Sequence, residues 1–175
     1  MKNFYEFNKL SDEQIREIAE NVERGNVCYI NANTREIIFM MNNEALSDYG
    51  ISWEDDDEEN ETPDDNSPSW QKEMYADVKA DMNKIDSWDV KDTIRIEKPE
   101  THEAFKFMEN FVDEVIPEGK LKQDFWKALS RSHPFSNFNT IVHNCRYREE
   151  WFEFKHNALE EYVREEIGYR CSEEE

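Results

Sequence analysis

The feature that most constrains the fold is an aromatic stretch that runs from Phe125 to Phe154. These thirty residues hold eight large aromatic side chains, namely Phe125, Trp126, Phe135, Phe138, Tyr147, Trp151, Phe152 and Phe154. A buried aromatic ring removes a large apolar area from water, which favours folding. We therefore expect this stretch to form the centre of the hydrophobic core.

The same region is basic, although the whole chain is very acidic. The 175 residues carry a formal net charge of −21. Between Gly119 and Arg148, six cations oppose the single acid Asp124, so this segment has a charge of +5 and the remainder has −26. A strongly negative protein is repelled by nucleic acid and by anionic membrane surfaces. The charge is compatible with a basic protein partner.

Length and composition indicate a folded protein that carries one acidic segment. We expect a single domain over residues 1–175. The aromatic content of 13% is higher than disordered chains have. From Glu54 to Asp65, however, the chain contains no base and no aliphatic side chain. Such a run repels itself, so we predict a flexible acidic insertion over residues 54–68 within the domain.

The cysteines and the hydrophobic pattern indicate in which cellular compartment the protein is found. Cys28, Cys145 and Cys171 are odd in number and form no CxxC motif. The sequence has no signal-peptide pattern and no apolar run long enough to cross a bilayer. We therefore expect a cytoplasmic protein with reduced thiols and no membrane contact.

Two β-rich runs predict a hairpin in the N-terminal half. They cover residues 27–30 and 37–41 and flank an Asn-rich connection. Asn33 in this connection can adopt positive φ more readily than most residues. A lone hairpin is marginal in water, so the alternating run Thr93–Glu97 is predicted to add a third strand.

Helical periodicity dominates the rest of the chain. Ser11 and Gln14 form a capping box that begins the first helix. A second helix is predicted to begin at Ser67-Pro68, and one of its faces is apolar: Trp70, Met74, Val78, Met82 and Ile85. Four more helices are predicted in the C-terminal half: one after Pro99, one around residues 121–129, one from Pro134, and one from Tyr147 to near Gly168. The predicted fold is α+β, with a small antiparallel sheet (the hairpin plus the third strand) packed against a mainly helical C-terminal half.

Several aromatic motifs resemble those of a known family. The motifs are Phe107–Phe111, Ala128-Leu129, Pro134–Phe138, Glu150–Phe154, Ala158-Leu159 and, near the N-terminus, Tyr29–Thr34. With them the chain resembles a bacterial family called uncharacterised protein family 158, over about two-thirds of its length. Members often have a small Gly-Ala-type turn where this chain has Ser132-His133-Pro134. The resemblance implies a fold and carries over no catalytic residue.

No motif indicates a catalytic site, a metal site or a cofactor. His143, Cys145 and His156 lack the paired spacing and the fourth ligand of a structural zinc site. The basic and aromatic residues of the +5 segment are the candidates for binding an anionic ligand or a partner: Trp126, Lys127, Arg131, His143, Arg146 and Arg148. A simpler interpretation is that their stems cover the aromatic core and their charges offset repulsion.

Two functions stay open from the sequence. The first is a non-enzymatic protein-interaction or regulatory module that presents an acidic surface to a basic protein partner. The alternative is a small ligand-binding or enzyme domain with a basic and aromatic pocket among the C-terminal helices. A third possibility, a nucleic-acid regulator, requires that the acidic insertion cover the basic residues in the absence of ligand. The sequence leaves the oligomeric state open.

Overall fold

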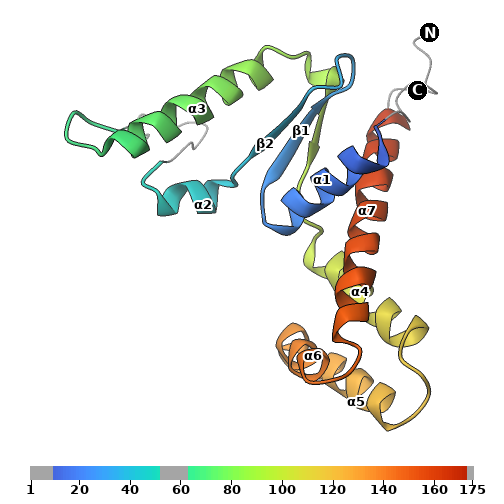
Figure 1. The fold of residues 1–175 in the computed structure, drawn as a ribbon. Helices are drawn as coiled ribbons and strands as arrows, with labels where there is room; N and C mark the ends of the chain where they lie inside the picture. The colour runs from blue at the N-terminus through green and yellow to red at the C-terminus, as the bar shows by residue number, and fades with distance from the viewer. Residues whose placement is uncertain (1–9, 52–62, 173–175) are drawn as a thin grey trace. The chain divides into compact units, whose positions relative to one another are not determined.

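A computed structural model describes residues 10–51 and 63–172 of the chain (Figure 1). Their arrangement confirms the predicted α+β class, because a three-stranded antiparallel sheet is combined with a mainly helical C-terminal half. The chain divides into a first unit, residues 1–98 with 166–175, and a second unit, residues 99–165. A single domain over 1–175 stays a prediction.

The first unit is organised around the sheet, whose strand order is β2-β1-β3 (Figure 1). Its strands are β1 (Val27–Asn31), β2 (Ile37–Met40) and β3 (Thr93–Ile96). Cys28 lies opposite Phe39 on one side and Ile96 on the other. Both the predicted hairpin and the predicted third strand are therefore confirmed.

Helix α1 (Asp12–Glu23) packs against β1 and covers the inner face of the sheet. The predicted capping box is present, since the Ser11 hydroxyl accepts from the amide of Gln14 at 3.2 Å and the Gln14 side chain accepts from the amide of Ser11 at 3.0 Å. The apolar stripe of α1 and the inner-face strand residues are buried together: Ile15, Ile18, Ala19, Val22, Cys28, Ile30, Ile94 and Ile96. They form the core of this unit.

Positive φ in the hairpin connection does not occur at the residue whose type favours it most. Arg35, with φ of 62°, is the connection residue that adopts positive φ, whereas Asn33, which tolerates positive φ better than most residues, does not. The Asn31 side chain explains the difference, because its oxygen accepts from the amides of Asn33 and Thr34, each at 2.9 Å. This local turn keeps Asn33 out of the left-handed region and moves the positive φ two residues along the chain.

A short helix that the sequence analysis did not predict, α2 (Asn43–Asp48), follows the hairpin. The Asn42 side chain caps it, with its oxygen accepting from the amide of Ala45 at 2.7 Å. The same side chain donates to the carbonyl of Gly25 at 2.8 Å. One asparagine therefore begins α2 and attaches it to the turn before β1.

The predicted acidic insertion over 54–68 is described only at its end, because residues 54–62 lie outside the described residues. At Asp64–Ser67 the chain makes a turn in which the Ser67 hydroxyl donates to the Asp64 carboxylate at 3.0 Å. The amide of Asn66 donates to the same carboxylate at 2.9 Å. These bonds, that from Ser67 above all, hold the pKa of Asp64 below its usual range. The turn leads into α3 (Ser69–Asp86), which is followed by η2 (Val90–Asp92).

The second unit is a helical assembly built on aromatic rings. Its helices are α4 (Thr101–Glu114), α5 (Lys120–Leu129), α6 (Pro134–His143) and the larger part of α7 (Arg148–Ser172), whose residues from 166 onward belong to the first unit. Phe111 of α4 is fully buried, and its ring meets four others at centroid distances of 5.1 to 6.5 Å, those of Phe125, Phe138, Trp151 and Phe154. The predicted aromatic centre is thus largely confirmed, although Trp126 and Phe152 are exposed.

The last helix is longer than predicted. We expected a stop near Gly168, but α7 continues through it to Ser172, so that prediction was wrong. A single glycine inside a helix costs about 1 kcal/mol relative to alanine. That amount is too small to end a helix whose preceding residue, Ile167, is buried.

One cation of the +5 segment lies inside the second unit. Lys122 is only 8% exposed. Its Nζ donates to the carbonyl oxygen of Asp113 at 2.9 Å and lies 3.0 Å from the carboxylate of Glu118. Because the last carbonyls of a helix have no partner within it, Lys122 satisfies the end of α4. This lysine is structural and is not available to a ligand.

We predict that Phe111→Ala lowers the free energy of unfolding by about 3–5 kcal/mol, since it leaves a cavity where four rings meet. Phe152→Ala is the matched control, because its ring is 41% exposed, and it should cost less than about 1 kcal/mol. Urea unfolding measures both values. Equal losses in the two variants would contradict the assigned core.

A second prediction concerns His133, which precedes α6 with a φ of 57°. Left-handed backbone costs roughly 1–2 kcal/mol for most residues and nothing for glycine. His133→Gly should therefore be neutral or raise stability by up to about 1 kcal/mol, whereas β-branched His133→Val should lower it. Thermal melts of the two variants test the sign, and a stabilising valine would refute the assignment.

Candidate functional site

The six basic and aromatic candidates of the sequence analysis all lie on the surface of the second unit. Trp126 and Lys127 belong to α5, and Arg131 follows that helix. His143 ends α6, Arg146 lies between α6 and α7, and Arg148 begins α7. Their role in binding stays a prediction.

Only part of this set is brought together. The rings of His143 and Phe152 are 6.0 Å apart, and the Arg148 guanidinium lies 5.3 Å from the same Phe152 ring. The Arg146 guanidinium instead stacks on Tyr147, 4.7 Å from its ring centre. Within the described parts of the chain, no side-chain hydrogen bond, ion pair or ring contact joins Trp126, Lys127 or Arg131 to these residues.

The residues considered as metal ligands have other partners. His156 lies 3.1 Å from the Glu160 carboxylate, one helical turn away. The Cys145 thiol lies 3.4 Å from the carbonyl oxygen of Val142 and donates to it. Among residues 10–51 and 63–172, no group of three His, Cys, Asp or Glu side chains is placed to hold a metal ion.

An unexpected surface lies in the first unit, on α3. The predicted apolar stripe of this helix is present, but none of its residues is buried in the structure. Trp70 is 52% exposed, and the other members are only partly covered. An amphipathic helix normally buries such a stripe. Because its apolar stripe is only partly buried, α3 is a candidate surface for binding another molecule.

Contacts near its two ends hold α3 beside the end of α2 and beside the hairpin. At the N-terminal end, Gln71 donates to the carbonyl of Tyr49 at 2.9 Å, and the rings of Tyr49 and Trp70 meet edge to face at 6.3 Å. Near the C-terminal end, Lys84 forms an ion pair with Glu36. The helix is therefore held in place without its stripe being packed into a core.

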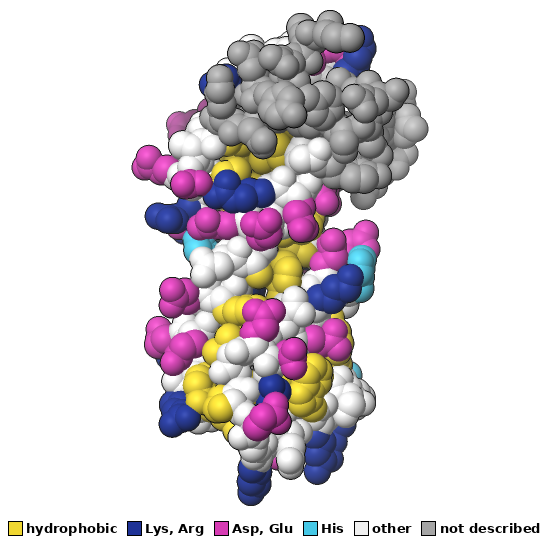
Figure 2. All heavy atoms as spheres, turned by 90° about the vertical axis from the view of Figure 1, so that its right-hand side faces the viewer, with side chains coloured by type: hydrophobic (Ala, Val, Ile, Leu, Met, Phe, Trp, Pro, Cys, Tyr) yellow, Lys and Arg dark blue, Asp and Glu magenta, His cyan; other side chains and the backbone are white. Residues whose placement is uncertain are grey.

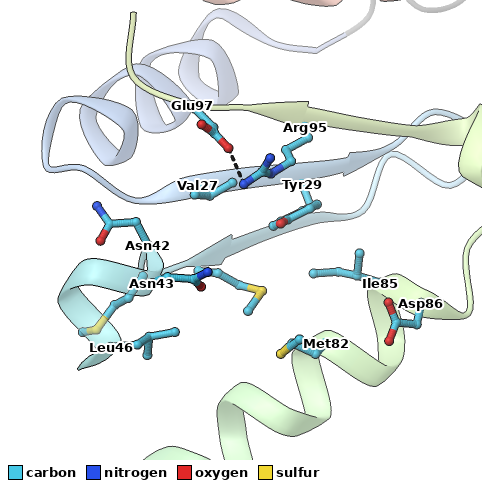
Figure 3. Close-up of a pocket in the computed structure, with 12 residues that line it drawn as sticks. Val27, Tyr29, Asn42, Asn43, Leu46, Met82, Ile85, Asp86, Arg95 and Glu97 are labelled. Carbon is cyan, nitrogen blue, oxygen red and sulfur yellow. Dashed lines mark ion pairs between the residues drawn. The ribbon is translucent and has the colours of Figure 1, made fainter. Parts of the chain in front are cut away.

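Two adjoining hollows separate α3 from the sheet. One has a volume of about 490 Å³ and lies between Met82 and Ile85 of α3, α2, and the outer sheet face at Val27 and Tyr29 (Figure 3). The other, about 380 Å³, extends toward the beginning of α3. Both include Met40 and Met41, so we treat them as one feature, the α3 groove. Its apolar lining at the second hollow consists of Phe39, Met40, Met41, Trp70, Met74 and Val78.

Carboxylates follow one edge of this groove. Glu73, Asp77 and Asp81 line it and are spaced four residues apart on α3, and we call them the acidic rim. Within the described residues, none of the three forms an ion pair with a cation. A signal for this rim was present in the sequence, because each rim acid immediately precedes an apolar residue of the stripe. The stripe was predicted from the sequence, whereas the acids beside it were not recognised.

The cation of the groove is already engaged. Arg95 on β3 forms an ion pair with Glu97, and its guanidinium lies 5.9 Å from the centre of the Tyr29 ring (Figure 3). Asp86 lines the same hollow from the end of α3. The groove therefore has an apolar lining, a paired arginine and unpaired acids.

The wider surface is also dominated by acids. Figure 2 shows one face of the molecule, where Asp and Glu side chains are spread over the surface and Lys and Arg side chains lie at the lower end of the view and at several places above it. Among the described helices, none is both long enough and apolar enough to cross a membrane.

Among the described residues, the thiol of Cys28 has the most strongly shifted pKa. Burial in the core, with a smaller contribution from the negative charge of Glu17, raises the pKa of its thiol from 9.0 to about 12. A displaced pKa often marks a catalytic group. Here the thiol is fully buried and its neutral form is favoured, so Cys28 is inert and structural.

Comparison with known proteins gives one match. The model of an uncharacterised protein family, UPF0158, matches residues 70–168. This range contains the resembling motifs of the C-terminal half, whereas Tyr29–Thr34 lies outside it. No curated protein and no solved structure matches the chain.

The Cys28 thiol is expected to contribute to the pH dependence of the free energy of unfolding. Its pKa is higher in the folded state, so its contribution to stability is complete below pH 9.0 and is lost as the pH rises from 9.0 to about 12. Between pH 9.0 and pH 10.5 the loss should be about 2 kcal/mol. Urea unfolding with reducing agent, compared with Cys28→Ala, isolates this effect from other titrating groups. Parallel pH profiles for the two proteins would refute it.

Proposed function

The chain belongs to the uncharacterised protein family UPF0158, and we propose that it is a non-enzymatic protein-interaction or regulatory module that binds a basic protein partner through the acidic rim of α3. The family description names no activity, so the proposal rests on the residues themselves.

The observation that carries the proposal is the spacing of the acidic rim. Like charges four residues apart on a helix destabilise it by about 0.2–0.5 kcal/mol per pair. Glu73 and Asp77 form one such pair, and Asp77 and Asp81 form a second. A cation supplied by a partner would remove this repulsion, and the free rim therefore favours association with a base.

The lysines of α3 are engaged elsewhere. Lys72 donates to the carbonyl oxygen of Asp65 at 2.9 Å, Lys79 lies 5.7 Å from the centre of the Tyr75 ring, and Lys84 pairs with Glu36. They leave the charge of the rim largely uncompensated. The net charge of −21 adds a long-range field that attracts basic molecules and raises their association rate.

The alternative, a ligand-binding or enzyme domain with a pocket among the C-terminal helices, has less support. The six residues that would form its site are exposed. Both hollows described above are lined by residues of the first unit alone. Burial keeps the thiol of Cys28 neutral, which disfavours the thiolate that would act as a nucleophile.

The proposal predicts localised, salt-sensitive binding of a basic probe. Poly-L-lysine should bind the protein with an affinity that falls steeply with salt. The triple variant Glu73→Gln/Asp77→Asn/Asp81→Asn should weaken binding roughly tenfold, since exposed pairs contribute about 0.2–1 kcal/mol each. Fluorescence anisotropy with labelled poly-L-lysine measures both effects.

A matched control separates the rim from net charge. Glu149→Gln/Glu150→Gln/Glu153→Gln removes the same number of exposed carboxylates from α7. It should weaken binding only slightly. If both triple variants weaken binding equally, the attraction is a property of net charge and the acidic rim is no binding surface.

A further inference from the structure

The α3 groove exposes apolar side chains as well as acids, and attraction between charges alone does not explain the apolar side chains. Four of the six methionines in the chain line it: Met40, Met41, Met74 and Met82. Met41 is 38% exposed and Trp70 is 52% exposed. Contiguous exposed apolar surface with a polar border is typical of a protein-binding site. Methionine suits such a site, because its flexible, polarisable side chain adapts to different partners.

The apolar stripe along the groove is long enough to contact a helix of several turns. The apolar stripe of α3 extends from Trp70 to Ile85, which corresponds to about 22 Å along the helix axis. A helix of about four turns has the same length. The groove has α3 as one wall and β2 with α2 as the other. Amphipathic helices bind grooves of this kind through apolar side chains spaced three or four residues apart.

The contacts of α3 leave this space accessible. Gln71 attaches the first turn to Tyr49, and Lys84 attaches the last turn to Glu36. Between these points, Met74 and Val78 line the groove and remain partly exposed. A ligand can therefore cover the stripe without breaking either attachment.

The negative charge of the acidic rim determines which of the possible ligands fits the α3 groove best. The acidic rim would repel the chain's own acidic segment between Glu54 and Asp65. A second copy that docked groove to groove would bring two acidic rims together, at a similar cost. A basic helix instead pairs with the rim while its apolar face covers the methionines. The complementary occupant is thus both basic and amphipathic.

We propose that the α3 groove binds the apolar face of a basic amphipathic helix of another protein. This inference rests on the proposed function and specifies its partner: rim carboxylates pair with Lys or Arg at the edge of the helix, and Met41, Met74 and Trp70 pack against its apolar residues. Apolar contact at the groove supplies the affinity that salt does not remove.

The test compares two labelled peptides of identical Leu and Lys composition. One places its leucines at helical spacing, and the other has the same residues scrambled so that no apolar face forms. Wild-type protein should bind the amphipathic peptide at least tenfold more tightly, as measured by fluorescence anisotropy at elevated salt. Equal affinity for the two peptides would overturn the groove proposal.

Substitutions in the α3 groove test whether the groove causes the preference for the amphipathic peptide. Met41→Gln/Met74→Gln should reduce the ratio of the two affinities to near one and leave binding of poly-L-lysine unchanged. The matched control Trp126→Gln/Phe152→Gln alters two similarly exposed apolar residues of the second unit and should retain the preference. Circular dichroism and urea midpoints confirm that each variant is folded. A preference that survives the groove substitutions would overturn the proposal.

The two proposals fail in distinguishable ways. If the rim and α7 triple variants bind poly-L-lysine alike, the proposed function fails. If their difference persists but the two peptides bind equally, only the groove fails. Size-exclusion chromatography with light scattering tests the remaining occupant. A wild-type dimer that dissociates on Met41→Gln/Met74→Gln would assign the groove to a second copy and overturn the proposal.

Discussion

Ring packing around Phe111 is the interaction on which the second unit depends. Helix α4 supplies Phe111, and α5, α6 and α7 each supply at least one ring that contacts it. Edge-to-face contacts fix relative orientation as well as proximity, because the ring edge is positive and the face is negative. The charged residues of these helices are therefore placed at the surface, while Lys122 closes the end of α4 from within.

The first unit is held together differently, and this difference creates the candidate site. Its core forms between α1 and the inner face of the sheet, where Ile18 and Ile30 are fully buried. The stripe of α3, in contrast, is only partly covered. The helix can therefore keep an apolar surface beside unpaired acids. A surface of this kind costs stability in the free protein, because the apolar side chains face water and the like charges repel each other.

Local patterns allowed much of the fold to be predicted. The capping box at Ser11, the hairpin and third strand, and the periodic helices were all recoverable, because each depends on neighbouring residues. Single backbone positions were less predictable. Arg35 rather than Asn33 adopts positive φ, because the Asn31 side chain bonds to the turn. The α2 cap at Asn42 was missed because part of its role is a bond to Gly25, distant in sequence.

The sequence by itself determined most of the secondary structure, the place of the aromatic core and the strong excess of acids, because periodicity, capping and composition are properties of the chain alone. Only the tertiary structure decided which apolar residues are buried. Trp126 and Phe125 are adjacent, yet Phe125 is fully buried and Trp126 is exposed. The stripe of α3 predicts a buried helix equally well, but its burial depends on what lies opposite. There the groove leaves it partly open, and an apolar stripe becomes a candidate binding surface.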